Sequence, residues 1–159
     1  MTQIQSSSFQ SIVGSALERM AFVILDPTER APDQAVAAAH QHAVVAIGDA
    51  APQYHLLVSA TDALLAEVAA NLLGVDASEV DCPQQREMVV TELANVLGGE
   101  LAMMLGGVEA SPRLGLPELV DAATARAHLR SVDEAPADAA FAFVLGADSG
   151  SLVVAAHPA

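Results

Sequence analysis

The sequence predicts an α+β fold with a mixed or antiparallel sheet. Three observations favour it: two strand-like runs joined by a turn come early, helical segments follow, and two further strand-like runs end the chain. Strands and helices are therefore grouped, whereas a doubly wound fold alternates them strictly. With 159 residues and no linker long enough to separate domains, we expect a single domain over residues 1–159.

The composition limits the possible partners. Twenty acidic and six basic residues give a formal net charge of −14; all six basic residues are arginine, and lysine is absent. Nucleic-acid binding is disfavoured, because phosphate neutralisation needs clustered lysine and arginine. Attraction to an anionic membrane is disfavoured for the same reason. The net negative charge of this chain is compatible with a partner that is positively charged at the interface.

The sequence predicts a cytoplasmic protein. Residues 1–10 lack a basic segment followed by a long apolar stretch, so no signal peptide is indicated. No uninterrupted apolar run reaches about 18 residues, so no membrane span is expected. Cys82 is the only cysteine, which excludes an intrachain disulfide. The neighbouring acidic Asp81 disfavours a nucleophilic thiolate at Cys82.

The first segments predict a helix and a break. Residues 9–20 place apolar side chains at helical spacing. The apolar run 21–25 is compatible with an extension of that helix or with the start of a strand. Asp26 precedes Pro27, which pushes it away from helical geometry, so the chain is expected to break there. A polar connector follows to about Gln34.

A hairpin and a helix come next. Residues 43–47 and 54–58 are strand-like runs on either side of a segment that contains glycine and proline, which predicts a hairpin. Thr61 or Asp62 caps a helix, and Gly74 is a suitable stop. The predicted apolar face of this helix is Leu64, Leu65, Val68, Ala69 and Leu72.

The longest predicted helix runs from about Pro83 to Leu105. Proline is tolerated near a helix start, because its missing N–H would be unpaired there anyway. At 100° per residue, one side of this helix is apolar and is expected to be buried. The residues on that side are Val89, Leu93, Leu97, Leu101 and Met104.

The last third of the chain predicts one short helix and a second hairpin. Residues 111–116 look extended and end at Pro117, and a short helix covers about 121–129. Two strands, 140–145 and 151–156, are joined by a turn-rich linker suited to a hairpin.

The histidines predict no metal site. His40 and His42 could face the same way in a strand, which leaves a metal role open, but surface histidines before a strand are the favoured interpretation. His55, His128 and His157 are isolated. The sequence has no glycine-rich phosphate loop, G-x-S-x-G elbow or H-E-x-x-H motif. We therefore expect no cofactor bound by this chain.

The long helix also carries a polar pattern. Glu92, Asn95 and Gly99 lie at i, i+3 and i+7, so a carboxylate and a carboxamide project side by side. On spacing alone, the simpler interpretation is that these residues are only exposed to solvent and have no special function. Gly98 and Gly99 together cost roughly 1–2 kcal/mol relative to alanines. That cost indicates either a neighbouring backbone that approaches closely or a bend or end of the helix.

Residues 91–99, Thr-Glu-Leu-Ala-Asn-Val-Leu-Gly-Gly, resemble the E-L-x-N-x-x-x-G helix of the CheX/CheC/FliY chemotaxis phosphatases. Pro117 stands 22 positions after Asn95, which is similar to the spacing in that family. The resemblance covers nearly the whole chain and is strongest to the CheX branch. It implies a sheet with two long helices packed on one face, and a homodimer. The strand at 151–156 could expose a sheet edge for pairing.

The resemblance implies hydrolysis of the aspartyl phosphate on a CheY-like response regulator. Asn95 would orient the attacking water, and Glu92 would pair with the lysine in the regulator's active site. The regulator would supply Mg²⁺, so this chain would need no metal of its own. One departure is Met88, four residues before the glutamate, where the family often has Asp or Ser. It implies weaker activity or an altered partner.

Two functions therefore stay open. The first is a phosphatase that uses Glu92 and Asn95; the second is a catalytically weak CheX-like module that binds a regulator or dimerises. The intact pair favours the first and Met88 favours the second. A small-molecule sensor is a third possibility, for which the sequence offers no polar constellation.

Overall fold

The protein is described by a computed structural model over residues 5–49, 53–106 and 113–159. Its centre is a six-stranded sheet in the order β1-β5-β6-β3-β2-β4, and every neighbouring pair of strands is antiparallel. The strands are β1 (Asp26–Pro27), β2 (Gln41–Ile47), β3 (Tyr54–Ala60), β4 (Glu118–Val120), β5 (Phe141–Gly146) and β6 (Ser151–Pro158). The predicted α+β class is confirmed, and the sheet is antiparallel.

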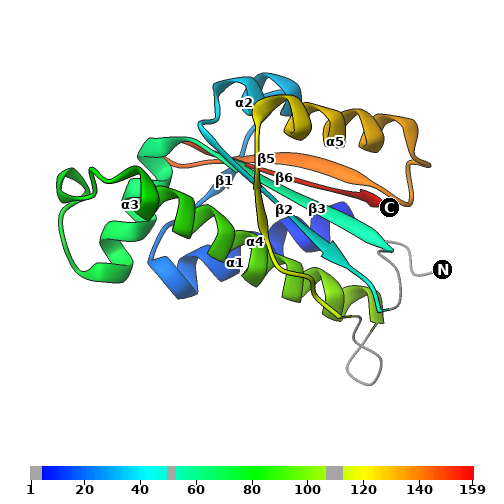
Figure 1. Cartoon of the computed structure of the whole chain (residues 1–159), viewed down its shortest axis with the longest axis horizontal. Coiled ribbons are helices and arrows are strands. Elements are labelled where there is room, and N and C mark those ends of the chain that lie inside the picture. The colour runs from blue at the N-terminus through cyan, green and yellow to red at the C-terminus, as the bar shows by residue number, and fades with distance from the viewer. Residues whose placement is uncertain (1–4, 50–52, 107–112) are drawn as a thin grey trace.

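Helices cover both faces of the sheet (Figure 1). Three helices lie on one face: α1 (Ser6–Ala21), α3 (Asp62–Leu73) and α4 (Pro83–Gly106). The shorter α2 (Pro32–Ala38) and α5 (Ala122–Glu134) lie on the other, and a single 3₁₀ turn, η1 (Ala77–Glu79), precedes α4. The two helices expected on one face, α3 and α4, lie on the same face, and α1 packs beside them as a third helix.

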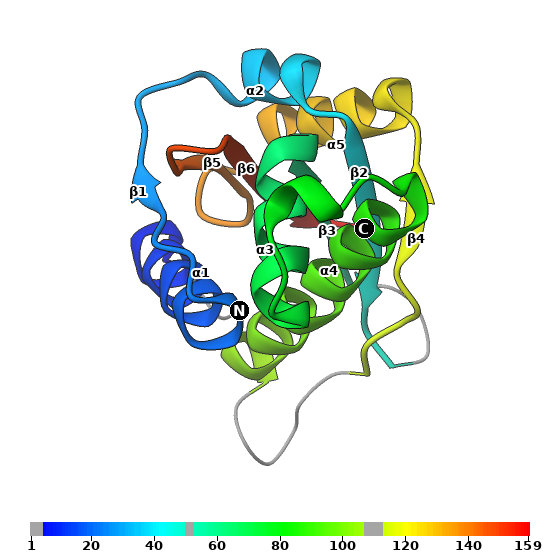
Figure 2. The same cartoon turned by 90° about the vertical axis from the view of Figure 1, so that its left-hand side faces the viewer.

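The sheet separates two apolar clusters. Figure 2 shows the sheet from the side, with α1, α3 and α4 on one side of it and α2 and α5 on the other. The larger cluster is formed under α1, α3 and α4 and includes Phe9, Leu17, Leu65, Leu93 and Leu97. The smaller cluster lies under α2 and α5 and contains Ala35, Val36, Leu57, Ala125, Leu129, Val144, Val153 and Ala155. Because both faces are covered, successive residues of the inner strands are apolar, in contrast to a half-exposed strand.

Both predicted hairpins are confirmed. In the first, Gln41 pairs with Ala60 and Ile47 with Tyr54; in the second, Gly146 pairs with Ser151. The expectation that the terminal strand exposes a sheet edge is wrong. β6 lies between β5 and β3, and its residues from Ser151 to His157 are buried, so its apolar run belongs to a central strand.

The N-terminal third differs from the prediction. Only Ala21 of the run 21–25 extends the helix, because Phe22 follows with a left-handed φ of 54° and ends α1. Residues 22–25 form neither helix nor strand. β1 then pairs with β5 at the sheet edge. Helix α2 begins inside the predicted polar connector. It was missed because only Ala35 and Val36 of this short helix are buried.

Helix α4 runs through Gly98 and Gly99 to Gly106, so the glycines do not end it. A Cβ at Gly98 would lie 2.8 Å from Val45 Cγ1 and 2.7 Å from Leu114 Cδ1. Close approach is therefore the reason for this glycine, although side chains and not a backbone make it. At Gly99, no neighbour lies within 4 Å of such a Cβ.

The two adjacent glycines should respond in opposite directions to larger side chains. We expect Gly98→Leu to destabilise the fold by about 1–3 kcal/mol, because it overpacks the contact between α4 and β2. Gly99→Ala should stabilise it by up to about 1 kcal/mol through helix propensity. Urea unfolding of both variants measures the difference, and equal midpoints would contradict the packing described for Gly98.

The length and composition of α4 are also those of a membrane-spanning helix. Its apolar side chains, however, pack against β2, β3 and α3 in the larger cluster. A helix with apolar residues over most of its surface is expected wherever it is enclosed by other elements. Core packing therefore accounts for the composition of α4.

Candidate functional site

Helix α4 presents Glu92 and Asn95 on its exposed side. Leu93, Ala94 and Leu97 are fully buried on the other side and fix the rotation of the helix. The predicted orientation of the helix is confirmed, including burial of Val89, Leu93, Leu97 and Leu101 and partial burial of Met104. A carboxylate and a carboxamide thus stand one turn apart on an element anchored in the core.

Neither site side chain is used by the fold. Within the described ranges, Glu92 and Asn95 form no side-chain hydrogen bond or ion pair with the rest of the chain. An exposed carboxylate and carboxamide without internal partners remain available to an external ligand. Their neighbour Thr91 bonds locally, donating to the carbonyl oxygens of Glu87 and Met88.

Helix α3 carries a second glutamate and asparagine that serve the fold. The Asn71 Nδ2 group donates to the Ala21 carbonyl oxygen at 2.8 Å and so ties α3 to the end of α1. The Glu67 carboxylate accepts a hydrogen bond from the Ser149 hydroxyl in the loop between β5 and β6. These contacts distinguish structural polar residues from the free pair on α4.

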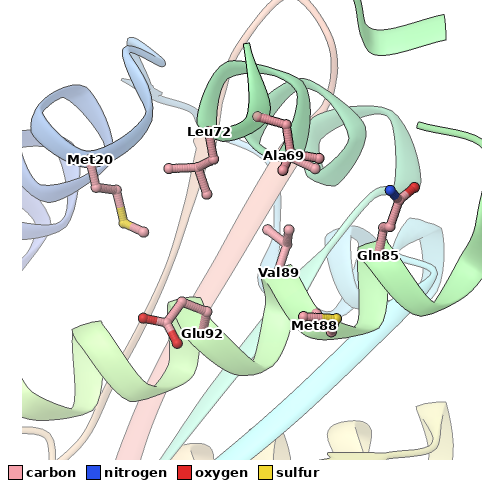
Figure 3. Close-up of a pocket in the computed structure, with 8 residues that line it drawn as sticks. Met20, Ala69, Leu72, Gln85, Met88, Val89 and Glu92 are labelled. Carbon is pink, nitrogen blue, oxygen red and sulfur yellow. The ribbon is translucent and has the colours of Figure 1, made fainter. Parts of the chain in front are cut away.

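An apolar groove of about 420 Å³ adjoins Glu92. It lies between the end of α1, the last turns of α3 and the first half of α4 (Figure 3). Figure 3 shows Met20, Leu72 and Val89 projecting into this space, with Glu92 at its margin. The residues that line the groove are Met20, Ala69, Leu72, Leu73, Gln85, Met88, Val89 and Glu92.

The apolar side chains at the rim of the groove are unusually exposed to solvent. Leu72 is 48% exposed, Leu73 is 59% exposed and Met88 is 70% exposed. Leu72 belongs to the predicted apolar face of α3, but unlike Leu64, Leu65, Val68 and Ala69 it is not buried, because its side chain faces this groove. Contiguous exposed apolar surface commonly marks an interaction site. Met88 continues that surface along α4 up to the turn that holds Glu92.

Two ion pairs connect the helices around the site. Arg86 Nε lies 3.3 Å from Asp62 Oδ1 and joins the starts of α4 and α3. Arg19 of α1 lies 3.9 Å from Glu100 of α4, with the arginine side chain 71% exposed. An exposed pair of this kind contributes at most about 1 kcal/mol. The position of α4 is therefore set mainly by the core.

His40 and His42 do not share a site. His42 is buried in β2 with its Nδ1 2.7 Å from the Ser59 hydroxyl, so the surface position expected for it is wrong. His40 is exposed and its Nδ1 accepts a hydrogen bond from the Asp62 N–H. Strand β2 begins at Gln41, two residues before the predicted strand, so His42 is part of the strand and faces the interior.

The burial of His42 should make stability depend on pH. Burial, and then the charge of Arg126, lowers the pKa of His42 below its ordinary 6.5, although Asp121 acts in the opposite direction. The unfolded chain therefore takes up the proton first as the pH falls. The contribution of neutral His42 to folding stability is therefore fully present above pH 6.5. It is lost as the pH falls below 6.5 through the lowered pKa of His42 in the folded protein. We expect a smaller loss in His42→Gln between about pH 7 and pH 5, measured by urea unfolding. Equal losses in both proteins would contradict this.

Three histidines that are isolated in the sequence meet in the structure. His55 of β3, His128 of α5 and His157 of β6 each place one ring nitrogen within 4.8 Å of the other two. Sequence spacing does not indicate this group, because it arises only when β3 pairs with β6 and α5 folds over them. The group lies on the opposite face of the sheet from α4.

No protein-family model and no curated protein matches this sequence. Solved structures do. The chemotaxis protein CheX from Vibrio vulnificus matches with a TM-score of 0.69 at 13% identity, over 97% of this chain and 95% of that one. A chemotactic CheC-like protein from Shewanella oneidensis matches with a TM-score of 0.65 at 14% identity, over 97% of both chains. A CheX-CheY-BeF3-Mg complex from Borrelia burgdorferi gives 0.63 at 14%, over 96% of both.

The chain therefore has the α+β fold of CheX and CheC-like chemotaxis proteins. The CheX-like assignment implied by the E-L-x-N-x-x-x-G segment is confirmed at the level of the fold.

Proposed function

We propose that this protein is a phosphatase that hydrolyses the aspartyl phosphate of a CheY-like response regulator. The observation that carries the proposal is the pair Glu92 and Asn95, which lie exposed one turn apart on α4 and have no side-chain partner among the residues that the structure describes. The CheX-like fold around this pair supports it, and one structure with that fold is a CheX-CheY complex with BeF3 and Mg²⁺.

Asn95 is proposed to position the attacking water. An acyl phosphate is already reactive, so phosphoryl transfer needs mainly positioning and charge stabilisation. A carboxamide can donate to and accept from the same water, and so hold it in line with the phosphorus. The buried neighbours Ala94 and Leu97 anchor α4 in the core and so fix the backbone that carries Asn95.

Glu92 is proposed to pair with the lysine in the regulator's active site. This chain has no lysine and carries a net charge of −14, so a cationic group on the partner is attracted to it. Complementary charge raises the rate of encounter and fixes the register of an interface. In this arrangement the regulator provides both the lysine and Mg²⁺.

The apolar groove is proposed to extend the docking surface beyond the polar pair. Interfaces combine an apolar centre with polar groups at the rim, and the exposed Leu72, Leu73 and Met88 adjoin Glu92 in this way. We expect Leu72→Glu to weaken regulator binding at least about tenfold, because it places a charge in an apolar contact. Ala123→Glu adds the same charge on the exposed side of α5 and should leave the affinity unchanged. Equal affinities of both variants in calorimetry would remove the groove from the interface.

The proposal is tested by adding the protein to a phosphorylated CheY-like regulator in Mg²⁺ and following phosphate release. Acceleration that grows with protein concentration and saturates is the expected result. Saturable binding without acceleration would instead support the second candidate, a regulator-binding module. Met88 is the observation that favours this candidate, because it replaces a polar surface next to Glu92 with an apolar one.

A homodimer and a cytoplasmic location are part of the proposal. The sheet edges that could pair with a second copy are β1 and β4, of two and three residues. Light scattering across a concentration range tests the dimer, and a single monomeric mass would contradict it.

A further inference from the structure

The histidine cluster, His55, His128 and His157, is built by three elements of the fold. His55 and His157 are direct partners in the pairing of β3 with β6, so their side chains stand next to each other on the same face of the sheet. His128 reaches them from α5. The three ring centroids lie 5.0–5.5 Å apart.

The hydrogen bonds of His157 define which ring nitrogen carries its proton. The Nδ1 atom lies 2.7 Å from the Pro158 carbonyl oxygen, which can only accept, so Nδ1 must donate. The lone pair is therefore on Nε2, which points into the cluster and lies 2.7 Å from His128 Nδ1. A histidine that ligates a metal commonly donates its other N–H to a backbone carbonyl in this way.

The three rings are shielded from solvent to different degrees. His157 is 5% exposed, and His55 and His128 are partly buried. Burial, followed by the neighbouring histidines, lowers the pKa of His128 to about 4, and burial lowers the pKa of His55. Neutral imidazole is the form that ligates a metal ion.

We propose that His55, His128 and His157 form a binding site for a divalent transition-metal ion, with Zn²⁺ as the expected occupant. Imidazole nitrogen suits zinc, and three histidines with one water complete a tetrahedral zinc site. Bonds of about 2.0–2.1 Å place the ligand nitrogens roughly 3.3 Å apart. The nitrogens of His128 and His157 must therefore separate slightly and that of His55 must approach. The proton that His128 Nδ1 donates to His157 Nε2 must also shift to His128 Nε2, so that Nδ1 offers its lone pair to the ion.

A bound ion would link α5 to the two central strands. Its effect is expected on stability and not on the proposed phosphatase site, because α4 lies on the other face of the sheet. The metal site and the proposed function can consequently fail or succeed independently.

The test is a titration of chelator-treated protein with Zn²⁺ by calorimetry, repeated with Co²⁺ to record its d–d absorption. The wild type should bind one equivalent, show the absorption of tetrahedral Co²⁺ and unfold at a higher temperature when Zn²⁺ is present. Removing a residue that hydrogen-bonds to a metal ligand lowers metal affinity by about 10–100-fold. His128→Ala removes a ligand itself, so its affinity for Zn²⁺ should fall at least about tenfold.

Two further variants complete the experiment. His55→Gln should lose affinity in the same way, which keeps the test valid if His128→Ala folds poorly in circular dichroism. His40→Ala removes an exposed histidine outside the cluster and should bind as the wild type does. Absence of binding in the wild type, or equal affinity in the wild type and both cluster variants, would overturn the proposal.

Discussion

Asn95→Ala is expected to lose about 100-fold of the acceleration of regulator dephosphorylation while keeping the affinity for the regulator, because a misplaced water costs rate and not binding. Asn95 is exposed and its side chain makes no internal hydrogen bond within the described residues, so its truncation should leave the fold intact. Single-turnover phosphate release at saturating protein measures the rate, and calorimetry measures the dissociation constant.

Gln84→Ala is the matched control for Asn95→Ala. It removes an exposed carboxamide from the start of the same helix, more than two turns before Asn95. It should retain the wild-type rate. If Asn95→Ala also retained it, the carboxamide would not position the water, and the mechanism would have to be abandoned even if the protein proved to be a phosphatase.

Glu92→Arg is expected to weaken regulator binding by at least about 2 kcal/mol, or roughly 30-fold, because the new charge opposes the partner's lysine. The change should act on affinity first, and the rate at saturating protein should fall less. The loss should diminish at high salt, since exposed charges are screened over about 10 Å at 0.1 M ionic strength.

Glu134→Arg is the matched control for Glu92→Arg. It makes the same change of net charge at an exposed position in the last turn of α5, on the opposite face of the sheet. It should bind as the wild type does. Equal weakening by both substitutions would assign the effect to overall charge, and Glu92 would lose its proposed role.

The long helix shows what local pattern can predict. The apolar stripe that contains Leu93 and Leu97 predicted both the extent of α4 and the face it exposes, so the placement of Glu92 and Asn95 followed from periodicity. The hairpins followed from apolar runs around turn residues. These features depend on neighbours in the sequence, which is why they could be predicted without the tertiary fold.

The features that were missed depend on contacts between distant segments. The central place of β6 follows from its pairing with both β3 and β5, which its apolar run permits but does not specify. Leu72 belongs to the helical stripe by spacing, but the groove between α1 and α4 leaves it exposed. The histidine cluster needs the register of His55 with His157 and the packing of α5 at the same time.

The most direct test of the central claim is the first-order decay of the phosphorylated regulator at saturating wild-type protein, compared with the decay of the regulator alone and with Asn95→Ala. Catalysis by the exposed pair on α4 predicts a faster decay with the wild type and a return towards the regulator's own rate with the variant. Identical decay in all three samples would contradict it.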